Sequence, residues 1–205
     1  MTYTLTTHPT RYTSYQDYLD DEQLSSERNY RLLSTGELIE VASEDDLNLR
    51  IGIALLMRLV QWQGGLLKDS VRNGNKEIQV PPTGDQCVNR KPDVMVLHPD
   101  HLIIAKQAIL LGMVPPLFVA EVVSPGNENS DSYQRDYVWK RQQYEGWGIA
   151  EYWIIDPHRD QVTALYLVEG TYQAEIYKGS QQIDSKVFSA LSLTAEQLLR
   201  GQMMS

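Results

Sequence analysis

Cysteine is nearly absent from the sequence, and positive charge is scarce. The 205 residues include one cysteine, Cys87, and 18 Lys and Arg against 27 Asp and Glu, which gives a formal net charge of −9. A single cysteine excludes an internal disulfide framework and any cysteine-based zinc site. The acidic balance argues against a protein held to nucleic acid or membrane by bulk charge alone.

Long apolar runs and export signals are also missing. No stretch of about 18 apolar residues occurs, so we expect no membrane span. The first ten residues lack the basic and apolar regions of a signal peptide, so we expect a cytoplasmic location. The apolar share of 42% is ordinary for a globular protein. We therefore expect an N-terminal arm with a short helix over residues 1–27 and a single domain over residues 28–205.

The order of predicted elements is typical of a mixed α/β fold. A hairpin is expected around Ser34-Thr35-Gly36, and a long helix from its N-cap Ser43 to about Gln63. The near-continuous apolar run 117–124 predicts a central strand that is covered on both faces. The remaining predicted elements are strands at 66–69, 78–80, 93–97 and 151–156, a helix at 131–147, a closing hairpin over 162–168 and 172–177, and a short helix capped by Thr194. The residues expected to face the core from the long helix are Leu47, Ile51, Ala54, Leu55, the stem of Arg58, and Val60.

Glu121 is an acid inside the predicted central strand. Alternation places it on the same face as Val119 and Val123. A buried carboxylate without a partner is costly, so we expect a cation or a hydrogen-bond donor beside it. The alternatives are a glutamate that faces solvent from an edge strand and a structural ion pair.

Lys140 interrupts an aromatic stripe on the predicted helix over 131–147. The stripe consists of Tyr133, Tyr137, Tyr144 and Trp147. A lysine on this core-facing side either extends toward solvent or brings its ammonium to a buried acid. The alternative is an i,i+4 pair with Asp136, and both arrangements are compatible because an acid one turn back can orient a catalytic lysine.

Asp93 follows Pro92 at the start of a predicted strand, and the proline gives the acid a defined direction. An acid at one strand, an acid in the next and a lysine on the following helix suit metal-assisted phosphodiester hydrolysis. Carboxylate oxygens hold Mg²⁺ or Mn²⁺, and the lysine orients the attacking water or stabilises charge. The four histidines lack ligand spacing and are expected at the surface, and the sequence has no phosphate-binding glycine loop, G-x-S-x-G or G-x-G-x-x-G motif.

Five segments carry a resemblance to a known family. They are YRLLSTGELIEVAS, KPDVMVL, FVAEVVSPGNENSD, RDYVWKRQQYEGWGIAEYWIIDP and TALYLVEGTYQ, and they lie between about residues 28 and 178. They resemble the Uma-type restriction endonuclease family, a branch of the PD-(D/E)XK nuclease superfamily. The resemblance implies a restriction-endonuclease-like core, with a four- or five-stranded mixed sheet flanked by helices, and divalent-metal-dependent cleavage of DNA with Mg²⁺ or Mn²⁺.

The resemblance also assigns roles to residues. Asp93 matches the PD acid and Glu121 the second metal ligand, with the backbone carbonyl of Val122 as a third candidate. The superfamily lysine two residues after the glutamate is Val123 here, and Lys140 matches the helical lysine of this branch.

Further residues match the family less closely. Glu40 and Glu44 are candidates for an additional acid, and Asn48 stands where the family often has histidine. Glu151 and Asp156 match the EYW…DP motif, and a structural role for both is the alternative.

The charge pattern leaves room for a nucleic-acid substrate. The first 50 residues hold ten acids and four bases, so most of the net charge lies there. A local basic patch is expected from Arg90, Lys91, Arg135, Lys140 and Arg141. A homodimer is compatible with cutting two strands. Two other functions stay open: a catalytically silent nuclease fold that acts as a binding module, and a hydrolase of another phosphoester such as a nucleotide.

Overall fold

The computed structural model of the chain describes residues 11–24, 29–41, 45–62, 68–105, 107–189 and 191–202. Within these residues, six strands form one mixed sheet in the order β11-β10-β9-β8-β6-β3. The strands are β3 (Val71–Asn73), β6 (Val94–Val96), β8 (Phe118–Val122), β9 (Glu151–Asp156), β10 (Gln161–Val168) and β11 (Thr171–Tyr177). Neighbouring strands are antiparallel except for the parallel pair β8–β9. The mixed α/β class is confirmed, and the sheet is wider than expected because β3 adds an edge strand beside β6.

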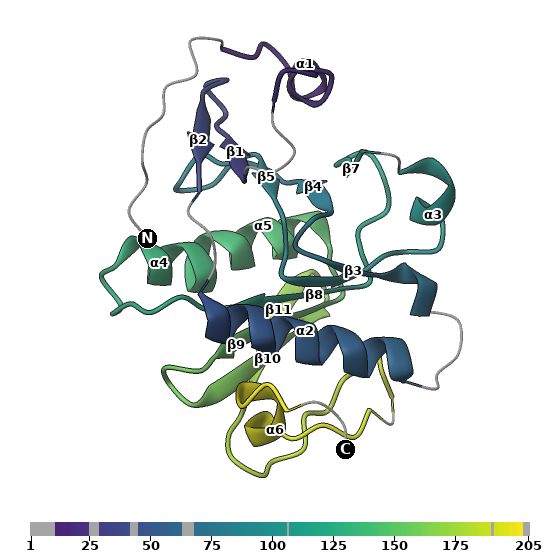
Figure 1. The fold of residues 1–205 in the computed structure, drawn as a ribbon, viewed down its shortest axis with the longest axis vertical. Helices are drawn as coiled ribbons and strands as arrows, with labels where there is room; N and C mark the ends of the chain where they lie inside the picture. The colour runs from purple at the N-terminus through teal and green to yellow at the C-terminus, as the bar shows by residue number, and fades with distance from the viewer. Residues whose placement is uncertain are drawn as a thin grey trace.

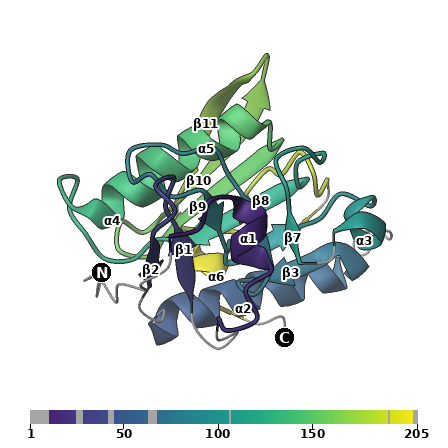
Figure 2. The same ribbon diagram turned by 90° about the horizontal axis from the view of Figure 1, so that it is seen from above.

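Helices cover both faces of this sheet. Helix α2 (Asp46–Gln61) lies on one face (Figure 2). The opposite face is covered by α4 (Asp131–Tyr133), the π-helix η2 (Gln134–Trp139) and α5 (Lys140–Trp147). The short helix α6 (Ala195–Leu199) contributes to the same core as α2.

Helix α2 begins later than the sequence predicts. Its N-cap is Asp45, whose side chain accepts the N–H of Asn48, so the prediction of Ser43 as N-cap is wrong. Ser43 itself lies outside the described residues. Ile51, Ala54 and Leu55 are buried as predicted, whereas Val60 is 38% exposed and Leu59 takes its place in the core.

The central strand β8 is buried along its whole length, as its apolar run predicts. Phe118, Ala120 and Val122 face the core that α2 covers. Val119 and Val123 face the other core, to which Tyr144 of α5 contributes. Alternation places Glu121 on that second face, where burial demands a partner.

An N-terminal unit lies above one end of the sheet (Figure 1). It consists of α1 (Tyr15–Leu19) and the hairpin β1 (Tyr30–Leu32) and β2 (Leu38–Glu40). These elements share a small core made of Tyr12, Tyr18, Tyr30, Leu32 and Leu38. The hydroxyls of Tyr15 and Tyr18 donate to the carboxylate of Glu77 on β4 (Glu77–Gln79), which ties the unit to the rest of the chain.

Several short elements differ from the sequence-based expectations. Residues 66 and 67 of the strand expected over 66–69 lie outside the described residues, and its last two residues lie in a 3₁₀ turn, η1 (Lys68–Ser70), with strand β3 beginning at Val71. The strand predicted at 78–80 is β4, which forms a second sheet with β5 (Asn89–Arg90) and β7 (Ala108–Ile109). Strand β7 and helix α3 (His101–Ile104) were not predicted from the sequence. Among the described residues, no helix has the length and apolar content needed to cross a membrane.

The closing hairpin β10–β11 is confirmed, with Glu169 and Gly170 at positive φ in its turn. Glu151 of β9 anchors the chain that follows this hairpin. Its carboxylate accepts the indole N–H of Trp153 at 2.7 Å and the backbone N–H groups of Lys186 and Val187 at 2.8 and 2.9 Å. Burial raises the pKa of this carboxyl, although the three hydrogen bonds oppose the shift.

Replacing Glu151 by Ala should therefore destabilise the fold. We expect the free energy of unfolding to fall by about 3 kcal/mol, because buried donors lose their acceptor. Glu196→Ala, in an exposed pair with Arg200, is the control and should cost less than about 1 kcal/mol. Urea unfolding followed by tryptophan fluorescence measures both values, and equal losses would contradict the anchoring role of Glu151.

Candidate active site

The carboxylate of Glu121 has two donors beside it. Glu121 is 3% exposed, in the middle of β8. Its Oε2 accepts from the ammonium of Lys140 at 2.8 Å. Its Oε1 accepts from the hydroxyl of Tyr144 at 2.6 Å. Burial, together with the charge of Glu121, raises the pKa of Tyr144 well above its usual value, so its hydroxyl keeps the proton that it donates. The cation expected beside this buried acid is Lys140.

Lys140 lies between two acids. Its Nζ is 2.8 Å from Glu121 Oε2 and 2.9 Å from Asp136 Oδ1. Burial alone lowers the pKa of the lysine, but the charges of Asp136 and then Glu121 outweigh burial and raise it. The two pairings considered from the sequence therefore occur together, and the lysine is charged.

Asp136 is itself held by Arg135. The Nε and Nη2 groups of Arg135 donate to the two carboxylate oxygens at 2.9 and 2.7 Å. Burial raises the pKa of Asp136, and the charges of Lys140 and Arg135 outweigh burial and lower it. Asp136 was not among the predicted site residues, although its i,i+4 spacing to Lys140 was the signal that pointed to it.

The π-helix η2 brings Arg135 and Lys140 to the same side. The backbone N–H of Lys140 donates to the carbonyl of Arg135, five residues earlier. A regular α-helix pairs residues four apart, so the prediction of one regular helix over 131–147 does not place these two cations together. Single π-turns of this kind are frequent at functional sites.

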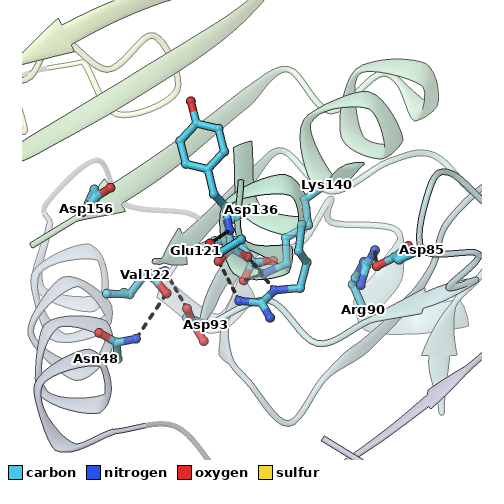
Figure 3. Close-up of polar contacts among 12 residues, drawn as sticks. Asn48, Asp85, Arg90, Asp93, Glu121, Val122, Asp136, Lys140 and Asp156 are labelled. Carbon is cyan, nitrogen blue, oxygen red and sulfur yellow. Dashed lines mark hydrogen bonds and ion pairs between the residues drawn. The ribbon is translucent and has the colours of Figure 1, made fainter. Parts of the chain in front are cut away.

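Asp93 lies beside Glu121 on the neighbouring strand. The register pairs Val94 of β6 with Ala120 of β8, which brings the preceding Asp93 toward Glu121. Oδ2 of Asp93 accepts the backbone N–H of Val122 at 2.6 Å, and Nδ2 of Asn48 donates to the carbonyl of Val122 at 3.4 Å (Figure 3). Asn48 of helix α2 thus contacts the same residue, at its carbonyl.

These groups line a cavity of about 460 Å³. Its floor consists of Asp93, Glu121, Val122, Asp136 and Lys140. One wall is the face of α2 that carries Asn48, Leu49, Gly52, Ile53 and Leu56. The other lining residues include Asn29, Arg31 and Val41, which lie in or next to the N-terminal hairpin. They also include Asn73–Asn75, from the end of β3 into the turn before β4. The structure therefore brings Asp93, Glu121, Val122 and Lys140 together in one cavity.

The predicted basic residues have different surroundings. Lys91 and Arg135 line the cavity, together with Arg31, which the sequence analysis did not name. Arg90 also borders the cavity, but it is 2% exposed and its guanidinium is bound by Asp85 at 2.7 Å and by Gln143 at 2.8 Å. Arg141 donates to the carbonyl of Tyr172 and is not among the described lining residues.

The arrangement of Arg90 and Arg141 has a structural explanation. Arg90 links strand β5 to helix α5 through Gln143, and Arg141 links α5 to strand β11. Both guanidinium groups are thus engaged in holding elements together, so the basic patch that reaches the cavity is smaller than expected.

Three acids predicted as candidates, Glu40, Glu44 and Asp156, do not lie on the described cavity floor. Glu40 ends β2 and is not one of the lining residues that the structure describes, whereas Glu44 lies outside the described residues. Asp156 accepts the hydroxyl of Tyr137 and two backbone N–H groups of the following turn, which is a structural role.

His101 is buried with Nε2 2.7 Å from the carbonyl of Val114, so its predicted surface position is wrong.

The oxygen donors on the cavity floor suit a hard divalent cation. Among the described residues, no group of three or more His, Cys, Asp or Glu is arranged to hold a metal ion. Two carboxylates and one carbonyl, from Asp93, Glu121 and Val122, are the kind of set that Mg²⁺ or Mn²⁺ accepts when water and phosphate complete the shell. Glu121 retains acceptor capacity because an ionised carboxylate offers about four lone-pair sites. The residues present thus fit such an ion.

Comparison with known proteins identifies the family. The sequence profile of Uma2, described as "Putative restriction endonuclease", matches residues 15–196. The chain belongs to the Uma2 family. The resemblance seen in the sequence is therefore confirmed, and the membership supports a nuclease-type function.

A solved structure is similar in fold to this Uma2 chain. It is the crystal structure of "a putative nuclease belonging to DUF820" from Anabaena variabilis ATCC 29413, with a TM-score of 0.57 and 13% sequence identity. The similarity covers 85% of this chain and 92% of the other. No curated protein matches the chain significantly.

The ion pair between Lys140 and Glu121 can be tested by a double-mutant cycle. Lys140→Met should lower the free energy of unfolding by about 3 kcal/mol, because it leaves buried acids without their cation. Adding Glu121→Gln removes one of those charges, so the double variant should be at least about 1 kcal/mol more stable than the sum of the single changes predicts. Urea unfolding of the four proteins measures this coupling, and strictly additive losses would contradict the pairing.

Proposed function

We propose that this Uma2-family chain is a divalent-metal-dependent endonuclease that hydrolyses phosphodiester bonds of DNA. The observation that carries the proposal is the convergence of Asp93, Glu121 and Lys140 on the floor of one cavity. Two acids and a charged lysine suit metal-assisted phosphoryl transfer. The family membership supports the same class of reaction.

Asp93, Glu121 and the carbonyl of Val122 would hold Mg²⁺ or Mn²⁺. When bound, such an ion lowers the pKa of a coordinated water and neutralises charge on the phosphate. In the hydrolysis, the water oxygen forms a new bond to phosphorus and the bond from phosphorus to the leaving sugar oxygen breaks. The proton that the water loses is balanced by the proton that the leaving oxygen gains.

Lys140 acts in this scheme as a charged hydrogen-bond donor. Its pKa is raised by Asp136 and Glu121, so it is poorly suited to accept a proton from water. Its ammonium instead orients the attacking water or stabilises negative charge on the phosphate oxygens. Asp136 serves as a positioning residue, because it contacts the lysine ammonium at 2.9 Å and is itself held by Arg135.

Asp93→Asn tests the role of the first acid. Asparagine keeps an oxygen that can accept the N–H of Val122, but it removes the charge, so we expect cleavage to fall at least about 100-fold while the fold is retained. Asp100→Asn, an exposed acid outside the described cavity lining, is the matched control and should cleave at the wild-type rate. Plasmid and oligonucleotide cleavage with Mn²⁺, with and without EDTA, measures both.

Wild-type cleavage by Asp93→Asn would refute the assignment. Cleavage of no nucleic acid by the wild-type protein would support the silent binding module instead. Hydrolysis of mononucleotides that exceeds cleavage of long DNA would support a different phosphoesterase.

Gly52 keeps space open beside Asp93. It lies inside helix α2, where glycine costs about 0.5–1 kcal/mol relative to alanine. A Cβ at this position would lie 3.9 Å from the Cβ of Asp93, in contact but without a clash. A helix glycine that lines the cavity at this cost indicates that the space beside Asp93 is needed.

Gly52→Ala should therefore separate stability from activity. We expect the free energy of unfolding to rise by about 0.5–1 kcal/mol and cleavage to fall about tenfold, since small misplacements near the reacting groups are costly. Gly146→Ala in α5 is the control, because a Cβ there would meet no atom within 4 Å. It should be stabilised similarly and cleave normally, and an unchanged rate in Gly52→Ala would contradict the role of this space.

A further inference from the structure

The reactive groups line a partly open cavity. Glu121 is 3% exposed, and the cavity of about 460 Å³ is lined by helix α2, by residues of the N-terminal hairpin region and by Asn73–Asn75. This volume is typical of sites for small molecules. A phosphate within continuous duplex DNA is flanked by stacked base pairs and a second strand, which cannot enter a space of this size. A single unpaired nucleotide is small enough to enter it.

The two sides of the cavity differ in chemistry. On the wall formed by α2, Leu49 and Ile53 are each 52% exposed although both are large and apolar. Arg31 and Lys91 supply positive charge elsewhere in the lining, and Arg135 lies there paired with Asp136. An unpaired nucleotide has a matching pair of surfaces, since its base offers an apolar face that stacking hides in a duplex and its phosphate is an anion.

The charge distribution also favours one nucleotide over a long duplex. The chain has a net charge of −9, yet five cations and three acids line the cavity. The five cations are Arg31, Arg90, Lys91, Arg135 and Lys140. Arg90 is paired with Asp85, Arg135 and Lys140 share Asp136, and Lys91 lies 4.0 Å from Glu77. Duplex binding draws on many phosphate contacts spread over a basic surface. Five cations against three acids leave the lining side chains with a small formal excess of positive charge, which suits one or two phosphates rather than many.

We propose that this site cleaves unpaired DNA, with one nucleotide entering the cavity, its base against Leu49 and Ile53 and its phosphate toward Arg31 and Lys91. The proposal rests on the proposed function and names the substrate class of the same site. The bond changes are those of the hydrolysis described above, with water as the only co-reactant.

Three forms of one labelled oligonucleotide test this preference with Mn²⁺. They are the free strand, the strand annealed to its full complement, and the strand annealed to a complement that leaves an internal unpaired segment. We expect kcat/KM to be at least about tenfold higher for the free strand than for the duplex, and the third substrate to be cut within its unpaired segment. Equal or faster cleavage of the duplex would overturn this proposal and leave the nuclease function intact. Cleavage of none of the three would overturn both.

A pair of variants on α2 tests the apolar wall. Ile53→Ser removes an apolar contact in the cavity, and we expect KM for the free strand to rise about fivefold with kcat nearly unchanged. Val60→Ser is the matched control, because Val60 is an exposed apolar residue of the same helix but is not among the described lining residues. It should leave both constants unchanged. Equal effects of the two substitutions, or none at Ile53, would overturn the placement of the base.

Discussion

A carboxylate in the middle of a fully buried strand must be neutralised, and much of the site follows from that requirement. Glu121 is buried on the face of the sheet that α5 covers, so its charge is balanced by the hydrogen bonds from Lys140 and Tyr144. Lys140 is in turn shared with Asp136, and Asp136 is held by Arg135. The result is a chain of alternating charges that spans β8 and the helix facing it and ends at the cavity floor.

This arrangement serves stability and chemistry with the same atoms. Because the ammonium of Lys140 is held by two acids, its position and its charge are set before any substrate arrives. The π-turn in η2 is the structural device that makes this possible, since it rotates Arg135 and Lys140 to the same side of the helix. If the proposed reaction takes place here, a substitution in this network changes folding and catalysis together. Variants that retain hydrogen bonds, such as Asp93→Asn, then separate the two effects better than truncations do.

Local patterns in the sequence predicted the centre of the site, and long-range packing determined the rest. The apolar run of β8 and the interrupted aromatic stripe pointed to Glu121 and Lys140, because alternation and helical periodicity depend only on neighbouring residues. Arg31 and Gly52 reach the cavity through tertiary packing of a hairpin and a helix, which no local pattern encodes. Arg90 shows the opposite case: a cation expected to contact DNA is buried against Asp85 and Gln143. Strands of three residues, such as β3, are too short for an alternating pattern to be recognised.

The central claim is that Asp93 and Glu121 form a divalent-cation site on the cavity floor. Titration with Mn²⁺, followed by electron paramagnetic resonance, tests it directly in the wild-type protein and in Asp93→Asn. The account predicts one bound Mn²⁺ per chain in the wild type, and an affinity at least about tenfold weaker in the variant. Equal Mn²⁺ binding by the two proteins, or none by the wild type at millimolar Mn²⁺, would contradict it.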